Sequence, residues 1–560
     1  MRSKKLILLI LVLALIVRIW GVNFGLPQKH IIDEQAIVYS VFYAANYKLN
    51  AGLYLHAPLL PYILLFEYGC YFIVGRIIGI FSSTNDFAVS YLKDPTTLFL
   101  LGRLTGVLFG VGTVFLTYLI GEKFFKKYVG IIAAFLLAFI FLHVKESHYI
   151  KEDVIAGFFV LSVYYFSLRI KSYGKLKDYL LAGSLIALAI SAKYTSVVVI
   201  PAMLIAHFFN KKRKFINLFY AGLFGLLVFL LINLYLVLNF KSTYDWINSQ
   251  FVGNRISYDL ILAGKPAWWW FLLVNIPQGV GAPLFIAAVI GFLFTPILSI
   301  VPLTFLFTVD LWTKYKSARL AISLLPFFAL ATAVIFEKLQ TLIKNRKIKL
   351  ILVPSLMILI IYPSLSGTVK FDFLLTRSDT RKEASNWFTD NIDKDVKVVV
   401  EGTFKPEFPS NTNIYILPDR VELSRRINQS KNIGFDATYI KAFQEAVKDQ
   451  KGFEIISTPR VDMLYDEVTN EEKLLGSAEY YSNLNIDYLV LSSWTNKPNV
   501  NKEFQSSIEK YYHLIKEFKP TYEFPLDPHF IEVDYNILDR VDLLGKNIIF
   551  GPVISIYQKN

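Results

Sequence analysis

Apolar stretches dominate the first two thirds of the chain and then stop. Runs of about 17 to 25 apolar residues, long enough to cross a hydrocarbon core about 30 Å thick, recur from residue 6 to about residue 366. They predict a mainly α-helical module over residues 1–366 with about 11 to 13 membrane helices. Residues 367–560 lack such runs, which predicts a second domain that is soluble.

Shorter helical and strand-like patterns alternate in this second domain. Asp379 opens a segment, 379–392, whose apolar residues recur at helical spacing, so we expect Asp379 to cap a helix. An amphipathic helix is predicted over 436–449. Strand-like runs lie at 396–402, 453–458, 487–493 and 550–558. This alternation, without a cofactor motif, predicts a small α/β or α+β domain.

Composition supports a membrane protein and gives the net charge its meaning. The mean hydropathy is +0.45, and the chain contains 47 Phe and 33 Tyr, which is outside the range of ordinary soluble proteins. The formal charge of +14 does not indicate a nucleic-acid partner, because the basic residues cluster in short loops between apolar runs. This distribution assigns those loops to the cytoplasm. They are 2–5, 122–128, 169–177, 210–214 and 344–349.

The N-terminus and the single cysteine narrow the expectations further. No small-residue cleavage site follows the basic start, so residues 6–24 are expected to stay as a first membrane helix. Cys70 lies in an apolar segment and has no partner in the chain. Neither disulfides nor a Cys-ligated metal site is therefore expected.

One apolar stretch conflicts with the loop assignment. Three stretches (6–24, 58–81 and 98–121) separate two loops that should both be cytoplasmic, and three crossings would reverse the orientation. Residues 58–81 contain two prolines, a Glu and an Arg, so we predict a re-entrant or surface-lying helical pair there. The alternative, that 58–81 crosses and the charge rule fails at one loop, stays open. The favoured topology places residues 367–560 outside the cytoplasm.

With this topology, charged residues from five parts of the chain gather on the external side. They are Asp33, Glu34, His56, Glu152, Asp153, Lys193, Lys314, Lys316 and Arg319. Charged groups at membrane helices are costly unless they are paired, hydrated or functional. A carboxylate can take a proton from an acceptor hydroxyl, while Lys and Arg can hold a phosphate. The combination predicts displacement of a lipid-linked phosphate at the membrane surface.

Each of these residues also has a structural interpretation. Asp33 and Glu34 can cap an amphipathic helix, and Glu152 and Asp153 can begin another. His56 can be a structural loop histidine. Lys193 can extend toward the membrane surface, and Lys314, Lys316 and Arg319 can anchor the chain at the interface.

The motifs around these residues resemble the GT-C superfamily of polytopic glycosyltransferases, especially its protein O-mannosyltransferase and aminoarabinose-transferase branch. The resemblance covers most of residues 1–366. The acidic pair "DE" looks like the family signature, and "HAPLLPYIL" is similar to a downstream "HPPL" segment in which Ala57 replaces the first proline. "SHYIKEDVIAGFF" resembles the second external loop, whose aspartate matches Asp153, and "AISAKYTSVVVIP" resembles the turn whose lysine matches Lys193. "KYKSARLAISLLPFFAL" resembles a later helix in which Arg319 is matched and Leu320 departs from a common aromatic residue.

The resemblance implies an integral membrane glycosyltransferase that moves a sugar from a polyprenyl-phosphate donor to a hydroxyl on a protein, lipid or glycan, with inversion. Asp33 would deprotonate or orient the acceptor, and Glu34 or Asp153 would share that task. Lys193 and Arg319 would stabilise the departing phosphate. His56 and Glu152 are further candidates for substrate or metal contact, and a divalent metal stays open because one His with carboxylates is a weak ligand pattern.

Three rival functions fit part of the sequence. An oligosaccharyltransferase of the same superfamily would be expected to carry a "WWD"-type motif, whereas residues 367–560 contain only Trp387 and Trp494, far apart. A transporter or lipid flippase would favour internal repeats and charges near the bilayer midplane, and neither is evident. A non-catalytic scaffold of envelope assembly would use Asp33 and Asp153 only as helix caps.

Overall fold

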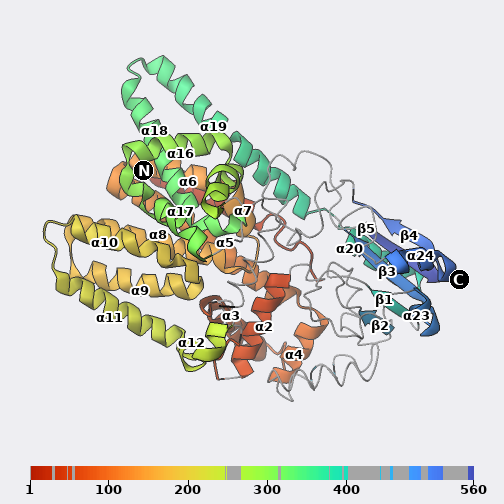
Figure 1. Ribbon diagram of the computed structural model, residues 1–560. Coiled ribbons are helices and arrows are strands. Elements are labelled where there is room, and N and C mark those ends of the chain that lie inside the picture. Colours follow the sequence, from red (N-terminus) through yellow and green to blue (C-terminus); the bar gives the residue numbers. More distant parts are fainter. Residues whose placement is uncertain are drawn as a thin grey trace.

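A computed structural model of the 560-residue chain shows a helical module and a smaller sheet domain (Figure 1). The structure describes most of residues 2–393 and parts of the region beyond. The described residues are 2–27, 32–46, 48–52, 57–245, 248, 266–312, 317–377, 379–393, 396–400, 442, 445, 454–457, 478–493, 502–520 and 553–560.

The first half of the helical module holds the acidic loops predicted from the sequence. Its helices are α1 (Arg2–Ile19), α2 (Ile32–Asn46), α3 (Leu59–Ile77), α4 (Thr84–Lys93), α5 (Thr96–Ile120) with a π-helical end η1 (Gly121–Phe125), α6 (Lys127–Ala138), α7 (Phe141–Glu146), α8 (Glu152–Tyr173), α9 (Leu176–Ala192), the 3-10 turn η2 (Tyr194–Val199) and α10 (Ile200–Phe208). Helix α7 is a single short turn in the connection between α6 and α8.

The second half completes the module and leads into the sheet domain. It contains α11 (Phe215–Ile232), α12 (Leu234–Leu238), α14 (Ala267–Trp270), η3 (Phe271–Asn275), α15 (Ile276–Val280), α16 (Ala282–Phe294), η4 (Pro296–Ser299), α17 (Ile300–Trp312), η5 (Ala318–Leu324), α18 (Leu325–Leu342) and α19 (Arg346–Leu375). Helix α19 runs through residue 366, so the domain boundary drawn there is wrong. The sheet domain begins after Leu375.

Several helices are long and apolar enough to cross a membrane. Length and composition select six among the described residues, or seven if Ala267–Val280 and Ala282–Phe294, bent by 118°, are one broken span. Helix α1 has 18 residues but four basic ones, and α9 has 17 residues, so both fall outside that count. The chain is a multi-pass membrane protein. The predicted number of 11 to 13 membrane helices stays a prediction.

Small residues let some of these helices pack closely. A Cβ added to Gly183 of α9 would lie 2.1 Å from the carbonyl oxygen of Ala221 in α11, and one added to Gly291 of α16 would lie 2.1 Å from that of Ala331 in α18. Neither position accepts a larger residue without moving a helix. Such close approach is typical of membrane helices, where packing replaces the hydrophobic effect between segments.

The basic connections lie at one end of the helical module. The N-terminus, the α10–α11 connection and the α18–α19 connection are all at the end away from the sheet (Figure 1). Helix α19 extends from that end toward the sheet domain. We call the opposite end of the module, which faces the sheet, the sheet-side end. This arrangement agrees with the predicted grouping of the basic loops.

Residues 59–77 form one continuous helix, so the helical pair predicted within 58–81 is wrong. The middle of α3, at Tyr68, donates a hydrogen bond of 2.8 Å to the carbonyl of Leu98 in the first turns of α5. Helix α3 also packs on α2 and on α9, whose last residue Ala192 belongs to the same buried cluster. Helix α3 therefore covers the sheet-side ends of its neighbours, as a helix lying on the membrane surface would. That it does not cross stays a prediction, because its length and composition permit crossing.

The second domain is an α/β sandwich around a five-stranded sheet of order β2-β1-β3-β5-β4, which confirms the predicted α/β class. The strands are β1 (Lys397–Val400), β2 (Glu454–Ser457), β3 (Tyr488–Ser493), β4 (Tyr512–Phe518) and β5 (Val553–Lys559). Strand β1 pairs in parallel with β2 and β3, whereas β5 pairs antiparallel with β3 and β4. Strands β1, β2, β3 and β5 were predicted, and β4 was missed.

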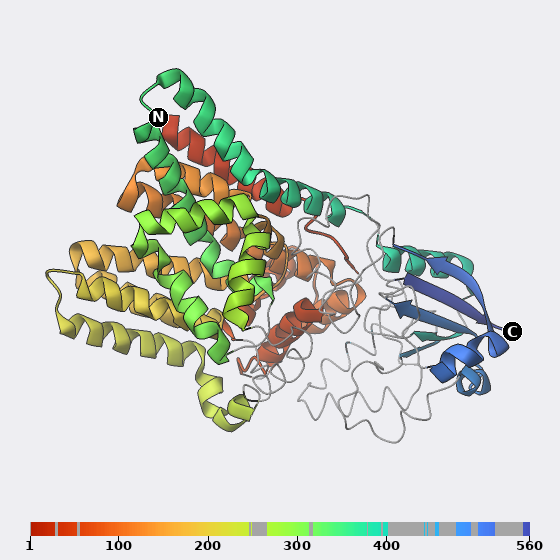
Figure 2. The same ribbon diagram turned by 45° about the horizontal axis from the view of Figure 1, so that its top comes forward.

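Helices cover both faces of this sheet. Helix α20 (Thr380–Asn391) packs on one face, and α23 (Ala478–Asn483) and α24 (Lys502–Tyr511) pack on the other (Figure 2). Alternate residues of β1 point to opposite faces, so Val398 contacts the α20 side and Val399 the α23 side. Asp379 caps α20 by accepting a hydrogen bond from the backbone N–H of Arg381, as predicted. The helix predicted over 436–449 lies outside the described residues except for Ala442 and Glu445.

Candidate active site

Asp33 joins three distant segments of the helical module. It lies in the first turn of α2, where its Oδ2 accepts a hydrogen bond of 2.6 Å from Nη1 of Arg319, 286 residues away. The same oxygen lies 3.3 Å from Nζ of Lys151. The Asp33 side chain is 33% exposed, so it is the accessible acid of the cluster. The structure thus brings together two of the predicted site residues, Asp33 and Arg319, and adds Lys151.

Asp153 and Lys193 form a second ion pair. Asp153 is in the first turn of α8 and is almost fully buried, with 2% of its side chain exposed. Its Oδ1 accepts a hydrogen bond from Nζ of Lys193, the extended residue between α9 and η2. Because its backbone leaves the helix there, Lys193 can direct its side chain across to α8. A buried carboxylate needs such a partner.

Arg319 interacts electrostatically with the carboxylates of both ion pairs. It opens η5 after the α17 connection, and its side chain is 18% exposed. Its positive charge interacts with Asp33, Asp153 and Glu152. Glu152 begins α8 and is partly buried. The predicted residues Asp33, Glu152, Asp153, Lys193 and Arg319 therefore share one site at the sheet-side end.

Glu34 is turned away from this site. It is fully buried and forms a bidentate ion pair with Arg103 of α5, through bonds of 2.9 Å from Nε and 2.7 Å from Nη2. Its Oε1 also accepts a bond of 2.9 Å from the backbone N–H of Ile150. Both carboxylate oxygens are thus occupied by the protein, so the geometry opposes a share for Glu34 in the chemistry. It fastens α2 to α5 and to the connection that leads to Asp153.

The α6–α8 connection contributes residues that the sequence analysis passed over. Lys145 and Glu146 are 1% and 2% exposed, and their charged atoms lie 3.1 Å apart. Burial disfavours the ionised Glu146, but the positive charges of Lys145, Lys151 and Arg319 outweigh it and hold the Glu146 pKa below its ordinary value. The sequence signal was present, because these residues stand within eight positions of Asp153.

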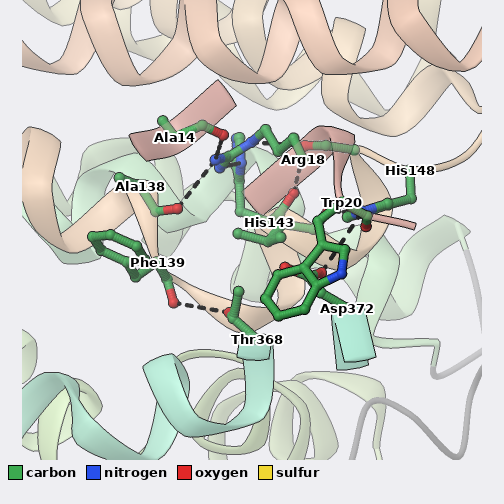
Figure 3. Close-up of polar contacts among 11 residues, drawn as sticks. Ala14, Arg18, Trp20, Ala138, Phe139, His143, His148, Thr368 and Asp372 are labelled. Atoms are coloured by element: carbon green, nitrogen blue, oxygen red, sulfur yellow. Dashed lines mark hydrogen bonds and ion pairs between the residues drawn. The ribbon is translucent and has the colours of Figure 1, made fainter. Parts of the chain in front are cut away.

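A buried network of hydrogen bonds fixes the α6–α8 connection on the side of α1 and α19 (Figure 3). Arg18 of α1 donates hydrogen bonds to Ala14 and Ala138 carbonyls and contacts Nδ1 of His143 at 2.9 Å. From α19, Ser364 accepts a bond from the backbone N–H of Phe141, and Thr368 donates one to the carbonyl of Phe139. Since α19 continues to the sheet domain, the connection that carries Glu146 and Lys151 is fixed between α1 and that helix. A fixed connection is what a preorganised site requires.

Three predicted residues and the metal question are left. His56, Lys314 and Lys316 lie outside the described residues. Among the residues that the structure describes, no three His, Cys, Asp or Glu side chains are grouped to hold a metal ion. The divalent metal stays a prediction.

The fold and the site define the class of protein. A multi-pass helical module with two acidic helix starts and two cationic segments at one end, followed by an α/β domain, is the architecture expected from the sequence. The fold agrees with the one that the resemblance to the GT-C superfamily implies.

Comparisons with known proteins show which proteins the chain is similar to. Residues 99–237 match the family "Dolichyl-phosphate-mannose-protein mannosyltransferase". The apo oligosaccharyltransferase of Archaeoglobus fulgidus matches with a TM-score of 0.52 at 12% identity, over 100% of this chain and 88% of that one. The same enzyme tethered to an acceptor peptide containing the NVT sequon matches with a TM-score of 0.50 at 12% identity, over 99% and 88%. No curated protein sequence matches the chain.

A further structure is ArnT from Cupriavidus metallidurans bound to undecaprenyl phosphate. It matches with a TM-score of 0.43 at 10% identity, over 72% of this chain and 84% of that one, and we draw nothing from so low a score. The sequence identities are low throughout, so the similarity concerns the fold and does not identify the substrates.

Proposed function

We propose that the protein transfers a sugar from a polyprenyl-phosphate donor to a hydroxyl acceptor on the extracytoplasmic face of the membrane, with inversion at the anomeric carbon. The observation that carries this proposal is the pairing of Asp33 with Arg319 next to the pairing of Asp153 with Lys193. The site thus places an accessible carboxylate beside two cations at one end of a membrane module. The GT-C fold and the mannosyltransferase family match support the same class of reaction.

The cations suit the donor. A lipid phosphate that leaves the sugar gains negative charge in the transition state, and fixed Lys and Arg groups stabilise that charge. Lys193 and Arg319 approach from two different segments, so a phosphate between them would be held from both sides. Lys151 adds a third positive group close to Asp33.

Asp33 suits the acceptor. It is the most exposed acid among the ion-paired carboxylates of the site, so an acceptor hydroxyl arriving from solution can reach it. It would take the hydroxyl proton while the oxygen attacks the anomeric carbon and the phosphate departs. Asp153 is buried against Lys193 and would hold that lysine in place.

The basic connections at the far end of the module support an extracytoplasmic site. They lie opposite the sheet-side end, and the loops that carry them are the ones that the positive-inside rule assigns to the cytoplasm. The sheet domain would then also be extracytoplasmic.

The test uses purified full-length protein in detergent with radiolabelled polyprenyl-phosphate hexoses and a mixture of hydroxyl acceptors. Wild type should move the label from the lipid to an acceptor. Asp33→Asn should lower the transfer rate by about 100- to 10,000-fold, the usual contribution of a general base. It should bind undecaprenyl phosphate at least as well as wild type, because Arg319 and Lys151 are no longer held by a carboxylate.

Asp390→Asn is the matched control, because Asp390 lies on the exposed side of α20 in the sheet domain. It should transfer like wild type. Full transfer by Asp33→Asn would exclude Asp33 as the base, and absence of transfer by wild type with every donor would favour the transporter or scaffold.

A further inference from the structure

One oxygen of Glu146 has no hydrogen-bond partner among the residues that the structure describes. The side chain is 2% exposed, and its Oε1 lies 3.1 Å from Nζ of Lys145. The other oxygen, Oε2, is sealed from solvent and accepts no hydrogen bond from any residue that the structure describes. A buried carboxylate oxygen without a donor is unfavourable, and it is rare in folded proteins except where a ligand supplies the missing hydrogen bond.

Glu146 is charged despite its burial. The three cations around it, Lys145, Lys151 and Arg319, keep its pKa below the ordinary value of a glutamate, so it is ionised at neutral pH. An ionised oxygen can only accept hydrogen bonds. Its missing partner must therefore be a donor, such as a hydroxyl group.

Glu146 belongs to the site and not to a separate cluster. Arg319 and Lys151, which act on its charge, are the same two cations that contact Asp33. Its own charge acts on Asp153. It therefore lies close to both ion pairs, but deeper than Asp33, with 2% of its side chain exposed against 33%.

The proposed donor consists of a phosphate and a sugar, which need different binding partners. Its phosphate needs cations, and Lys193 and Arg319 supply them in the proposed function. Its sugar carries several hydroxyl groups, and each one removed from water needs an acceptor. Asp33 and Asp153 pair with cations, and Glu146 pairs with Lys145 through Oε1, but Oε2 of Glu146 accepts no hydrogen bond from the described residues.

We propose that Glu146 binds the sugar of the donor, with Oε2 accepting a hydrogen bond from one of its hydroxyl groups. This inference rests on the proposed function, because it assumes a lipid-phosphate sugar in the site. Glu146 would contribute to the choice of sugar and to its orientation for attack.

The experiment compares two kinds of ligand, the lipid phosphate without a sugar and the same phosphate with a hexose. Undecaprenyl phosphate and undecaprenyl-phosphate hexoses (mannose, glucose and galactose) are titrated against full-length wild type and Glu146→Gln. For the hexose that wild type binds best, Glu146→Gln should bind about 10- to 100-fold more weakly, the loss expected for a hydrogen bond to a charged group. Its affinity for the sugar-free phosphate should change by less than about threefold, because the cations are untouched.

Two further arms keep the test decisive if Glu146→Gln is unstable. Glu509→Gln, on the exposed side of α24, is the matched control and should leave both affinities unchanged. Donors that lack one sugar hydroxyl are tested on wild type. One of these deoxy donors should lose the same 10- to 100-fold, and Glu146→Gln should no longer distinguish it from the full sugar.

The outcomes separate the inference from the proposed function. Equal losses of affinity for both ligands in Glu146→Gln would show that Glu146 only supports Lys145 and the fold, which overturns the inference. Wild-type affinity for every ligand in that variant would overturn it as well, while sugar transfer by wild type would leave the proposed function intact. If wild type neither binds nor transfers any lipid-phosphate sugar, both fall.

Discussion

Replacing Glu34 with Gln tests whether this residue is structural or chemical. The carboxylate accepts three hydrogen bonds, two from Arg103 and one from the backbone N–H of Ile150. Arg103 also donates bonds of 2.7 Å to the carbonyls of Val22 and Phe24. Both side chains of the pair are fully buried. The pair therefore fastens the segment before α2, helix α5 and the connection before α8 to one another.

The size of the effect follows from this burial. In Glu34→Gln, one carbonyl oxygen remains to accept hydrogen bonds, but the amide NH₂ faces an Arg103 donor and the negative charge is gone. Breaking a buried ion pair by removing one partner costs about 3–5 kcal/mol, because the other charge stays buried. The variant should thus lose at least about a hundredfold in its folding equilibrium constant.

The assay is thermal unfolding of the full-length protein in detergent, followed by size-exclusion chromatography. Glu337→Gln is the matched control, since it breaks the pair with Lys126, whose side chain is 64% exposed and stays hydrated. It should cost less than about 1 kcal/mol. A Glu34→Gln protein with wild-type stability, normal donor binding and no transfer would refute this reasoning and make Glu34 part of the chemistry.

Two further predictions concern topology and pH. In a Cys70→Ser background, Thr84→Cys should react with a membrane-impermeant maleimide that is added to the outside of oriented vesicles. Lys212→Cys should react only when the maleimide reaches the cytoplasmic side. Reaction of Thr84→Cys only from the cytoplasmic side would show that α3 crosses the membrane. Burial and the charge of Arg18 hold the pKa of His143 well below 6.5, so the folded state binds fewer protons than the unfolded state below that pH. The free energy of unfolding should therefore fall by up to about 1.4 kcal/mol per pH unit as pH drops below about 6.5. His143→Gln, which keeps an acceptor for Arg18, should reduce this loss of stability at low pH in thermal unfolding. An unchanged pH dependence would exclude His143 as its source.

The sequence predicted that the site residues lie on one side of the membrane, but not which of them pair. Asp33 and Arg319 were placed on one side by the alternation of apolar runs and basic loops, and the structure joins them. Glu34 was grouped with Asp33 because the two are adjacent in sequence. Neighbours on a helix point about 100° apart, so one faces the site and the other faces α5. Arg103, the partner of Glu34, is 69 residues away, and no local pattern identifies it.

The burial of the α6–α8 connection also could not be predicted from the sequence. Its many charged residues give no sign of burial in the sequence, yet Lys145, Glu146 and His148 are almost fully buried. Contacts from α1 and α19 bury them, and such contacts depend on tertiary packing rather than on local propensity. The same limit applies to strand β4, which directly follows α24 and offers no turn signal between them.

The charge balance of the site indicates how donor and acceptor steps would be connected in the proposed function. Each cation now has a carboxylate partner: Arg319 and Lys151 with Asp33, and Lys193 with Asp153. A carboxylate held by Arg and Lys is a weak base, because the cations stabilise its ionised form. A donor phosphate would draw Arg319 and Lys193 toward itself and add negative charge beside Asp33. Both changes raise the proton affinity of Asp33, so it would become an effective base only when a donor is present to receive the attack.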